Sequence, residues 1–114
     1  MRVYISGKIG EEVLSDATRE KFAKAERYLK EWDFDVFNPT TSGLGKMAEE
    51  QAARNGTDFY VEIMKLDLAE LRKCDAIYML KDWQESPGAI REHAEADSMG
   101  IAVWYESLEP DEDE

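Results

Sequence analysis

Short apolar runs that alternate with longer segments of helical periodicity restrict the fold of this chain more than any other feature. Runs rich in β-branched and aromatic residues predict four strands, at Arg2–Ser6, Asp35–Phe37, 76–80 and 101–105. Apolar residues at helical spacing predict helices over 14–32, 58–73 and 87–99, with a shorter one near 47–53. Strands that alternate with helices and are apolar along most of their length indicate an α/β fold with a parallel sheet covered on both faces.

Length and charge limit the domain number and the partners. The chain has 114 residues, 43% of them hydrophobic, which predicts one packed domain over residues 1–105. Six acidic residues in the last nine positions carry half of the net charge of −12, so residues 106–114 are expected to form a disordered acidic tail. An acidic body is a poor partner for duplex nucleic acid. No apolar run reaches the roughly 18 residues that a membrane span needs, so no membrane partner is expected.

The small number of cysteines and histidines argues against a metal site, and the absence of the known nucleotide-binding motifs argues against a cofactor. Cys74 is the only cysteine and His93 the only histidine, so an internal disulfide is impossible and no metal site is predicted. A reduced, cytoplasmic protein fits this composition. The sequence contains neither G-x-G-x-x-G nor G-x-x-x-x-G-K-[ST], and no cofactor is expected.

The start of the last predicted helix carries the features of an anion site. Ligands of such sheets bind at the carboxyl ends of the strands, and the segment 81–88 follows the third one. Ser86 suits the N-cap and Pro87 the first helical position, while Gly88 allows close approach to the backbone. Free N–H groups of Gly88 and Ala89, the Ser86 hydroxyl and the helix dipole would together hold an anion. The alternative is that Ser-Pro-Gly only starts the helix.

Two carboxylates occupy unusual helix positions. Glu92 has Ala89, Ala96 and Met99 as its neighbours on the helix surface, rather than a polar face. Asp67 lies in the middle of an apolar stripe, four residues from Ile63. Buried carboxylates are costly unless they are paired or used. The structural alternatives are an exposed Glu92 that stabilises its helix, and an Asp67 that caps a loop or pairs with a buried cation.

Three further residues near strand ends could each have either a role in the site or a purely structural role. Tyr4 contributes either to the site or simply to the core. Asn38 follows the second strand and either hydrogen-bonds a ligand or forms a turn with Pro39. Trp83 follows the third strand and either stacks on a base or packs against its own loop. The polar segment 40–56 is a candidate lid.

These residues, in the order YISGKIG, then Asp67-x7-Asp75, then Ser86-x-Gly88-x3-Glu92, resemble the nucleoside 2-deoxyribosyltransferase-like superfamily. Within it, the chain is most similar to a small phage and bacterial group and to deoxynucleoside monophosphate N-glycosidases. The resemblance covers residues 2–105. It implies a flavodoxin- or Rossmann-like three-layer sandwich with a four- or five-stranded, mostly parallel sheet. It also implies a homodimer or higher homo-oligomer that acts on a small-molecule nucleotide or nucleoside.

The resemblance further implies roles for individual residues. Glu92 would be the nucleophile and Asp67 an acid or orienting group, while Tyr4 would position Glu92. Ser86 matches a serine that the monophosphate glycosidases have at this position, and that serine suits a phosphate group. Gly7 would let the first loop approach the substrate. The arginine-bearing loop of the glycosidases has no match in residues 9–12, and Lys8, which departs from the family pattern, is the candidate for the positive charge. The expected reaction is cleavage of an N-glycosidic bond by hydrolysis or base transfer. Two other functions stay open, a nucleotide-binding module without turnover and a partner-binding domain.

Overall fold

The computed structural model describes residues 1–9 and 14–106, and the strands and helices within these ranges follow the predicted order. The strands are β1 (Arg2–Ser6), β2 (Asp35–Phe37), β3 (Ala76–Met79) and β4 (Ala102–Tyr105). The α-helices are α1 (Asp16–Lys30), α2 (Leu44–Asn55), α3 (Phe59–Leu71) and α4 (Pro87–Ser98), and a short 3-10 helix, η1 (Trp83–Glu85), precedes α4.

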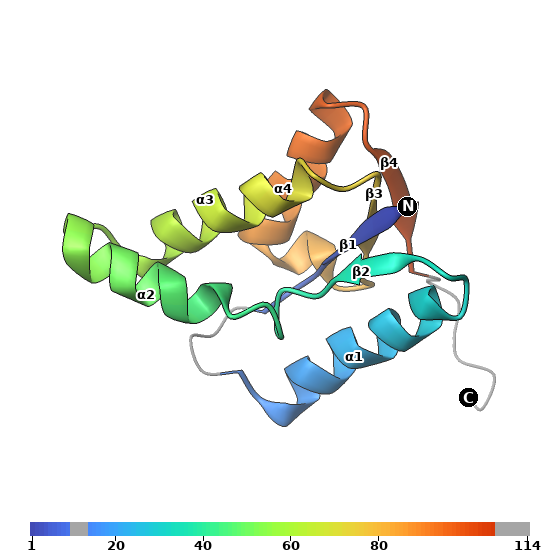
Figure 1. Ribbon diagram of the computed structural model, residues 1–114, viewed down its shortest axis with the longest axis horizontal. Helices are drawn as coiled ribbons and strands as arrows, with labels where there is room; N and C mark the ends of the chain where they lie inside the picture. Colours follow the sequence, from blue (N-terminus) through green and yellow to red (C-terminus); the bar gives the residue numbers. More distant parts are fainter. Residues whose placement is uncertain (10–13, 107–114) are drawn as a thin grey trace.

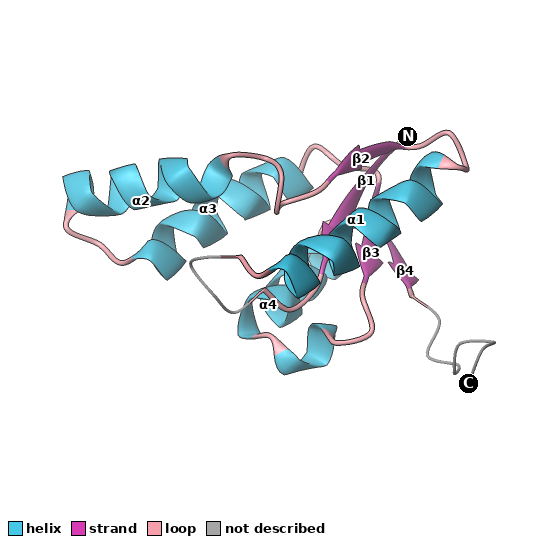
Figure 2. Ribbon diagram, turned by 90° about the horizontal axis from the view of Figure 1, so that it is seen from below, coloured by secondary structure: helices cyan, strands magenta, loops and turns pink. Residues whose placement is uncertain are grey.

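The four described strands form one parallel sheet in the order β2-β1-β3-β4. Helix α1 covers one face of this sheet, and α3 and α4 cover the other (Figures 1 and 2). The protein is therefore a three-layer α/β sandwich of the flavodoxin- or Rossmann-like type, as predicted. The sequence predicted four or five strands, and the sheet within the described residues has four, all of them parallel.

Alternate residues of the central strand β1 serve the two layers. Val3 and Ile5 pack with Phe22 and other apolar side chains on the α1 side. Tyr4 joins the core below α3 and α4, where its ring stacks on Phe37 at 5.1 Å between ring centres. Since side chains alternate along a strand, Ser6 also lies on the α3 and α4 side, so this layer receives the polar groups of β1.

Local signals explain where the helices begin. The Asp58 side chain accepts the Val61 N–H at 2.8 Å and caps α3. The helix therefore begins at Phe59, one residue after the predicted start at Asp58. Helix α2 runs over Leu44–Asn55, which is longer than the predicted 47–53. Its only buried residue is Ala48, and this explains its weak apolar periodicity. Helix α2 packs on α3 (Figure 1).

The predicted acidic tail, residues 106–114, lies only partly within the described residues. Residues 107–114 of the expected acidic tail lie outside the described residues. Glu106, its first residue, is bound to the sheet edge, because its N–H donates to the Met79 carbonyl at 2.7 Å and its carboxylate accepts the Lys81 N–H at 2.8 Å. No helix in the described part of the chain is long and apolar enough to cross a membrane.

Candidate active site

A cavity of about 860 Å³ lies where β1 ends and α4 begins. Helix α3 contributes four apolar side chains to its wall, Phe59, Tyr60, Ile63 and Met64. Polar side chains also line it, among them Ser6, Asp67, Ser86 and Glu92, which lie where β1 ends and along α3 and α4. The volume falls within the usual range of small-molecule sites, and the mixture of apolar wall and a few polar groups is typical of them.

Glu92 is held in the wall of this cavity by two hydroxyl groups. The residue is only 6% exposed. The Tyr4 hydroxyl donates to Oε2 at 2.7 Å, and the Ser6 hydroxyl donates to Oε1 at 2.6 Å. Both donors come from β1, two residues apart on one face of the sheet. Short bonds to each oxygen fix the orientation of the carboxylate group.

Asp67 lines the same cavity from α3 and lacks a comparable set of donors. It is 7% exposed, and its buried Oδ1 atom has no hydrogen-bond partner. A buried polar atom without a partner costs free energy and is rare in folded proteins. Because Asp67 also lines the cavity, a bound ligand could supply the missing partner. The structural alternative of a buried cation is not seen, since no ion pair joins a lysine or arginine to Asp67 in residues 1–9 and 14–106.

Burial raises the pKa values of both carboxyl groups. For Asp67, loss of hydration is the main cause, and the negative charges of Glu92 and Glu70 raise its pKa further. For Glu92, loss of hydration again raises the pKa, while the hydrogen bonds from Ser6 and Tyr4 act in the opposite direction. The pKa of Tyr4 lies well above its ordinary value because the ring is buried, so its hydroxyl remains a donor. The charge of Glu92 reaches Asp67, so protonation of one carboxyl group affects the other.

The start of α4 also borders the cavity, through Ser86, Pro87, Gly88 and Ala89. The prediction that the Ala89 N–H is free is wrong, because it donates to the Ser86 hydroxyl oxygen at 3.1 Å. The Gly88 N–H belongs to the first turn, where the helix itself provides no acceptor. The Ser86 proton stays available for an anion because this hydroxyl acts as acceptor toward Ala89. A side chain at Gly88 would point toward Met64 and Tyr60.

Three residues predicted to bind the ligand do not line the cavity. The Lys8 side chain pairs with Glu85 at 3.5 Å, and its N–H donates to Asp82. Asn38 is buried, and its side-chain oxygen accepts both the N–H and the hydroxyl of Thr40, so it forms the turn that was its structural alternative. Trp83 stacks on His93 with ring centres 4.4 Å apart, so it packs locally.

Gly7 lines the cavity, and the structure gives a packing reason for glycine at this position. A Cβ atom at this position would lie 2.7 Å from Leu80 Cδ1 and 2.9 Å from its Cβ. Close packing on Leu80 therefore requires glycine here. Tyr4, by contrast, is fully buried and reaches the site only through Glu92.

Sequence reasoning missed Ser6 and two cations. Arg19 from α1 and Lys46 from α2 line the cavity, and neither forms an ion pair with another residue of the described ranges. Glu49, one turn after Lys46, lines it as well. Nothing marks Arg19 or Lys46 in the sequence, because both lie on polar helix faces. Ser6 had a signal, since it shares a strand face with Tyr4.

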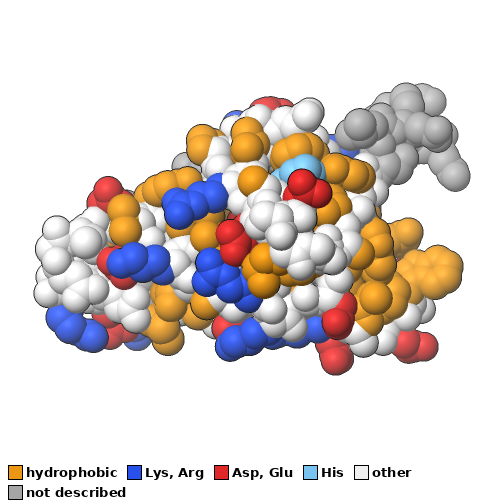
Figure 3. Space-filling model, turned by 90° about the horizontal axis from the view of Figure 1, so that it is seen from above, with side chains coloured by type: hydrophobic (Ala, Val, Ile, Leu, Met, Phe, Trp, Pro, Cys, Tyr) orange, Lys and Arg blue, Asp and Glu red, His pale blue; other side chains and the backbone are white. Residues whose placement is uncertain are grey.

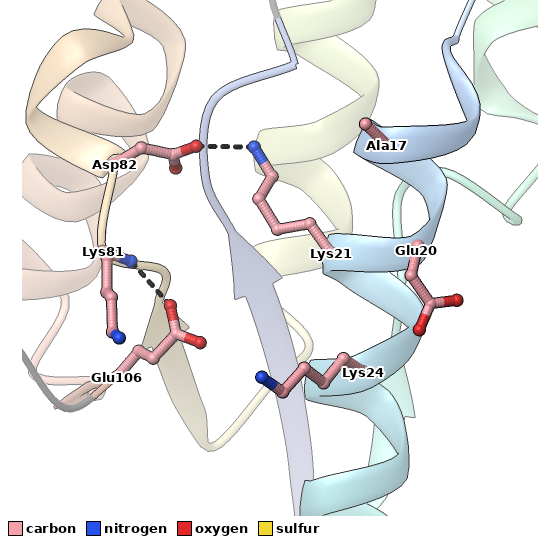
Figure 4. Close-up of a pocket in the computed structure, with 7 residues that line it drawn as sticks. All are labelled: Ala17, Glu20, Lys21, Lys24, Lys81, Asp82 and Glu106. Atoms are coloured by element: carbon pink, nitrogen blue, oxygen red, sulfur yellow. Dashed lines mark hydrogen bonds and ion pairs between the residues drawn. The ribbon is translucent and has the colours of Figure 1, made fainter. Parts of the chain in front are cut away.

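A smaller hollow of about 390 Å³ lies between α1 and the ends of β3 and β4 (Figure 4). Lys21 is bonded there to Asp82, and Glu106 to the Lys81 backbone. Three lysines and three acidic residues line it in equal number, so its charge favours no ligand. Within residues 1–9 and 14–106, no cluster of His, Cys, Asp or Glu could hold a metal ion.

Fold and site together define a flavodoxin- or Rossmann-like α/β protein with two buried carboxyl groups at one cavity. The chain belongs to the family described as domain of unknown function (DUF4406), whose model matches residues 1–105. Searches of curated proteins and of solved structures gave no significant match.

Proposed function

We propose that this protein cleaves the N-glycosidic bond of a nucleoside or deoxynucleoside 5′-monophosphate, or a related nucleotide, by hydrolysis or base transfer. The observation that carries the proposal is the meeting of Asp67 and Glu92 at one cavity. Both are more than nine-tenths buried, and they come from different helices. The similarity to nucleoside 2-deoxyribosyltransferases, noted from the sequence motifs, suggests this reaction among those that two carboxyl groups support.

The chemistry needs one charged and one protonated carboxyl group. Cleavage of the bond builds positive charge on the anomeric carbon, which the Glu92 carboxylate would stabilise or bond covalently. Asp67, whose pKa burial raises, would donate its proton to the departing base. Water, or a second base, would then attack the anomeric carbon, release the Glu92 carboxylate and give up a proton to Asp67. Neither step requires a cofactor or a metal ion.

A phosphate group fits the start of α4. The Ser86 hydroxyl and the Gly88 N–H lie at the positive end of the helix dipole, which favours an anion. The unpartnered Oδ1 of Asp67 in the same cavity is an independent indication of a ligand. Arg19 and Lys46, rather than the predicted Lys8, would supply positive charge at the cavity.

We further propose that the protein is cytoplasmic and forms a homodimer or higher homo-oligomer. Hydrophobic side chains are exposed on the side of α3 and α4, among charged groups of both signs (Figure 3). They include Tyr60, Val61 and Ile90, which are 45%, 38% and 45% exposed. Tyr60 also lines the cavity, so a second copy on this side would border the site. Light scattering with size-exclusion chromatography would measure the oligomeric state, and a monomer would refute this part.

Incubation with a panel of deoxynucleoside and ribonucleoside monophosphates, followed by chromatography of the released base, tests the reaction. Base release is expected from the wild type and none from Glu92→Ala. The matched control is Glu62→Ala, because Glu62 is equally buried on α3 but does not line the cavity. A second base added as acceptor distinguishes transfer from hydrolysis.

Three outcomes separate the functions that the sequence left open. Release that depends on Glu92 supports the enzyme. Tight binding with no release contradicts it and supports a nucleotide-binding module. No binding, seen as an unchanged melting temperature with every nucleotide, contradicts both and leaves a partner-binding domain.

A further inference from the structure

The hydrogen-bond donors around the acidic pair are distributed unequally. Two hydroxyl groups, from Tyr4 and Ser6, donate to separate oxygens of Glu92 at 2.7 and 2.6 Å. The neighbouring Asp67 has an Oδ1 atom that is buried and has no donor. Both residues are buried to a similar degree, 6% and 7% exposed, so loss of hydration alone does not distinguish them.

We infer that Ser6 is a positioning residue, which together with Tyr4 keeps Glu92 charged and leaves the proton of the acidic pair on Asp67. A hydroxyl group has one proton to donate. If Glu92 were protonated, one of its oxygens would become a donor, and the hydroxyl facing that oxygen would lose its acceptor. Tyr4 is fully buried and Ser6 is 1% exposed, and the acceptor of both hydroxyl groups is Glu92. The arrangement therefore favours the charged form of Glu92.

The opposite holds for Asp67. No donor satisfies Oδ1, and the negative charge of Glu70, together with that of Glu92, opposes a further charge at this position. The titratable groups next to the pair are Tyr4 from β1 and Glu70 from α3. The other charged side chains at the cavity are Arg19 from α1, and Lys46 and Glu49 from α2, and no ion pair within the described residues joins either cation to Asp67 or Glu92. When protonated, Asp67 presents an O–H group to the cavity, where a ligand atom could accept it.

The sequence gives this arrangement a simple origin. Tyr4 and Ser6 are separated by one residue in β1, so both side chains point to the α3 and α4 side. Glu92 lies on α4, which packs on β1. The consequence for catalysis, a charged Glu92 beside an acidic Asp67, rests on the proposed function, but the location of the proton does not.

Titration of the ligand-free full chain by NMR tests the inference directly. Glutamate and aspartate labelled with ¹³C at the side-chain carboxyl report each protonation, and Glu92→Gln and Asp67→Asn assign the two signals. In the wild type, Asp67 is expected to take up a proton at higher pH than Glu92. In Ser6→Ala, the Glu92 midpoint should move up by about one to two pH units, as expected for loss of a hydrogen bond to a charged group.

Two variants provide matched comparisons. Ser6→Thr keeps the hydroxyl group and should restore the wild-type order. Thr57→Val removes another 2.6 Å hydroxyl bond to a buried glutamate, Glu62, outside the cavity, and should leave the Asp67 and Glu92 signals unchanged. If Ser6→Ala does not fold, Tyr4→Phe is expected to move the Glu92 midpoint upward instead.

Either of two results would overturn the inference. One is a wild type in which Glu92 takes up its proton before Asp67. The other is a Glu92 midpoint that is the same in wild type and in folded Ser6→Ala. Because no substrate is used, absence of base release would refute the proposed function without touching this assignment.

Discussion

Two buried glutamates on neighbouring helices, Glu62 and Glu92, have opposite surroundings. Glu62 is 2% exposed, accepts the Thr57 hydroxyl at 2.6 Å and pairs with Lys65 at 3.5 Å. The hydrogen bond from Thr57 is the main reason why its pKa is lowered. Glu92 is 6% exposed, and its pKa is raised despite two hydrogen bonds. Its buried neighbour is another carboxyl group, Asp67.

The difference shows what kind of burial each glutamate represents. At Glu62, a hydroxyl group and a cation compensate the charge, as expected for a residue that stabilises the fold. At Asp67 and Glu92, burial opposes charge at both groups, and no ion pair within the described residues relieves it. Groups with pKa values shifted in this way are common at functional sites. Burial of the acidic pair therefore lowers the stability of the fold, and it does so at a cavity where the two carboxyl groups could act on a ligand.

The largest expected difference between the two glutamates concerns activity. Glu92→Gln removes the proposed nucleophile and should lower the rate of base release by about a thousandfold or more. Glu62→Gln should retain wild-type activity, because Glu62 does not line the cavity. Chromatography of the released base from both purified variants provides the measurement. Similar losses in both variants would mean that the two glutamates do not differ in role.

A second prediction concerns Gly88, at the proposed anion site beside the acidic pair. Gly88→Ala would place a methyl group 3.4 Å from Met64 Sδ, a contact that the fold tolerates, at the proposed anion site. Nucleotide affinity should fall about tenfold, equal to about 1.4 kcal/mol. Gly45→Ala is the control, because Gly45 lines the cavity with open space around its Cβ position. Calorimetric titration with a deoxynucleoside monophosphate measures both, and equal affinities would place the anion elsewhere.

A third prediction concerns the pH dependence of stability. A carboxyl group with a raised pKa binds its proton more tightly in the folded state, so the contribution of Asp67 to the free energy of unfolding falls as pH rises from about 4, the ordinary pKa of aspartate, through its folded pKa of about 8. The slope is about 1.4 kcal/mol per pH unit for each proton taken up on folding. Asp67→Asn should flatten this slope and raise stability at pH 8. Urea unfolding from pH 4 to 8 measures it, and an unchanged slope would contradict a buried acidic pair.

The smallest expected effect has the opposite sign and involves Glu62. A lowered pKa stabilises the folded state above the unfolded pKa, and this contribution is lost as pH falls through the folded pKa. Glu62→Gln should therefore lower the melting temperature at pH 7, by a few degrees for a domain of this size. The difference from wild type should shrink toward pH 3. A higher melting temperature of Glu62→Gln than of wild type at pH 7 would contradict this prediction. It would mean that the charge of Glu62 destabilises the fold, as expected for Asp67.

Much of the fold could be predicted because its signals are local. The bounds of β1 and β2 match the predicted strands, since each is a short β-rich run ended by a turn. Helix α4 was predicted from its Ser-Pro-Gly start. Helix α2 was predicted too short because Ala48 is its one buried residue, and a helix that buries so little leaves weak periodicity in the sequence.

The site was predictable only where a residue conflicts with its surroundings. Asp67 in an apolar stripe and Glu92 among small residues are such conflicts, and the structure brings both to one cavity. Their catalytic roles stay predictions. Lys8 was chosen for its nearness to the first strand in sequence, but its ion pair with Glu85 is a tertiary contact. Arg19 reaches the cavity only through the placement of α1, which no local pattern reveals.

A crystal structure of Glu92→Gln with a bound deoxynucleoside monophosphate tests the central claim most directly. The account predicts the anomeric carbon beside residue 92, the base edge against Asp67 and the phosphate at Ser86 and Gly88. A nucleotide bound outside this cavity, or one whose sugar faces away from residue 92, would contradict it.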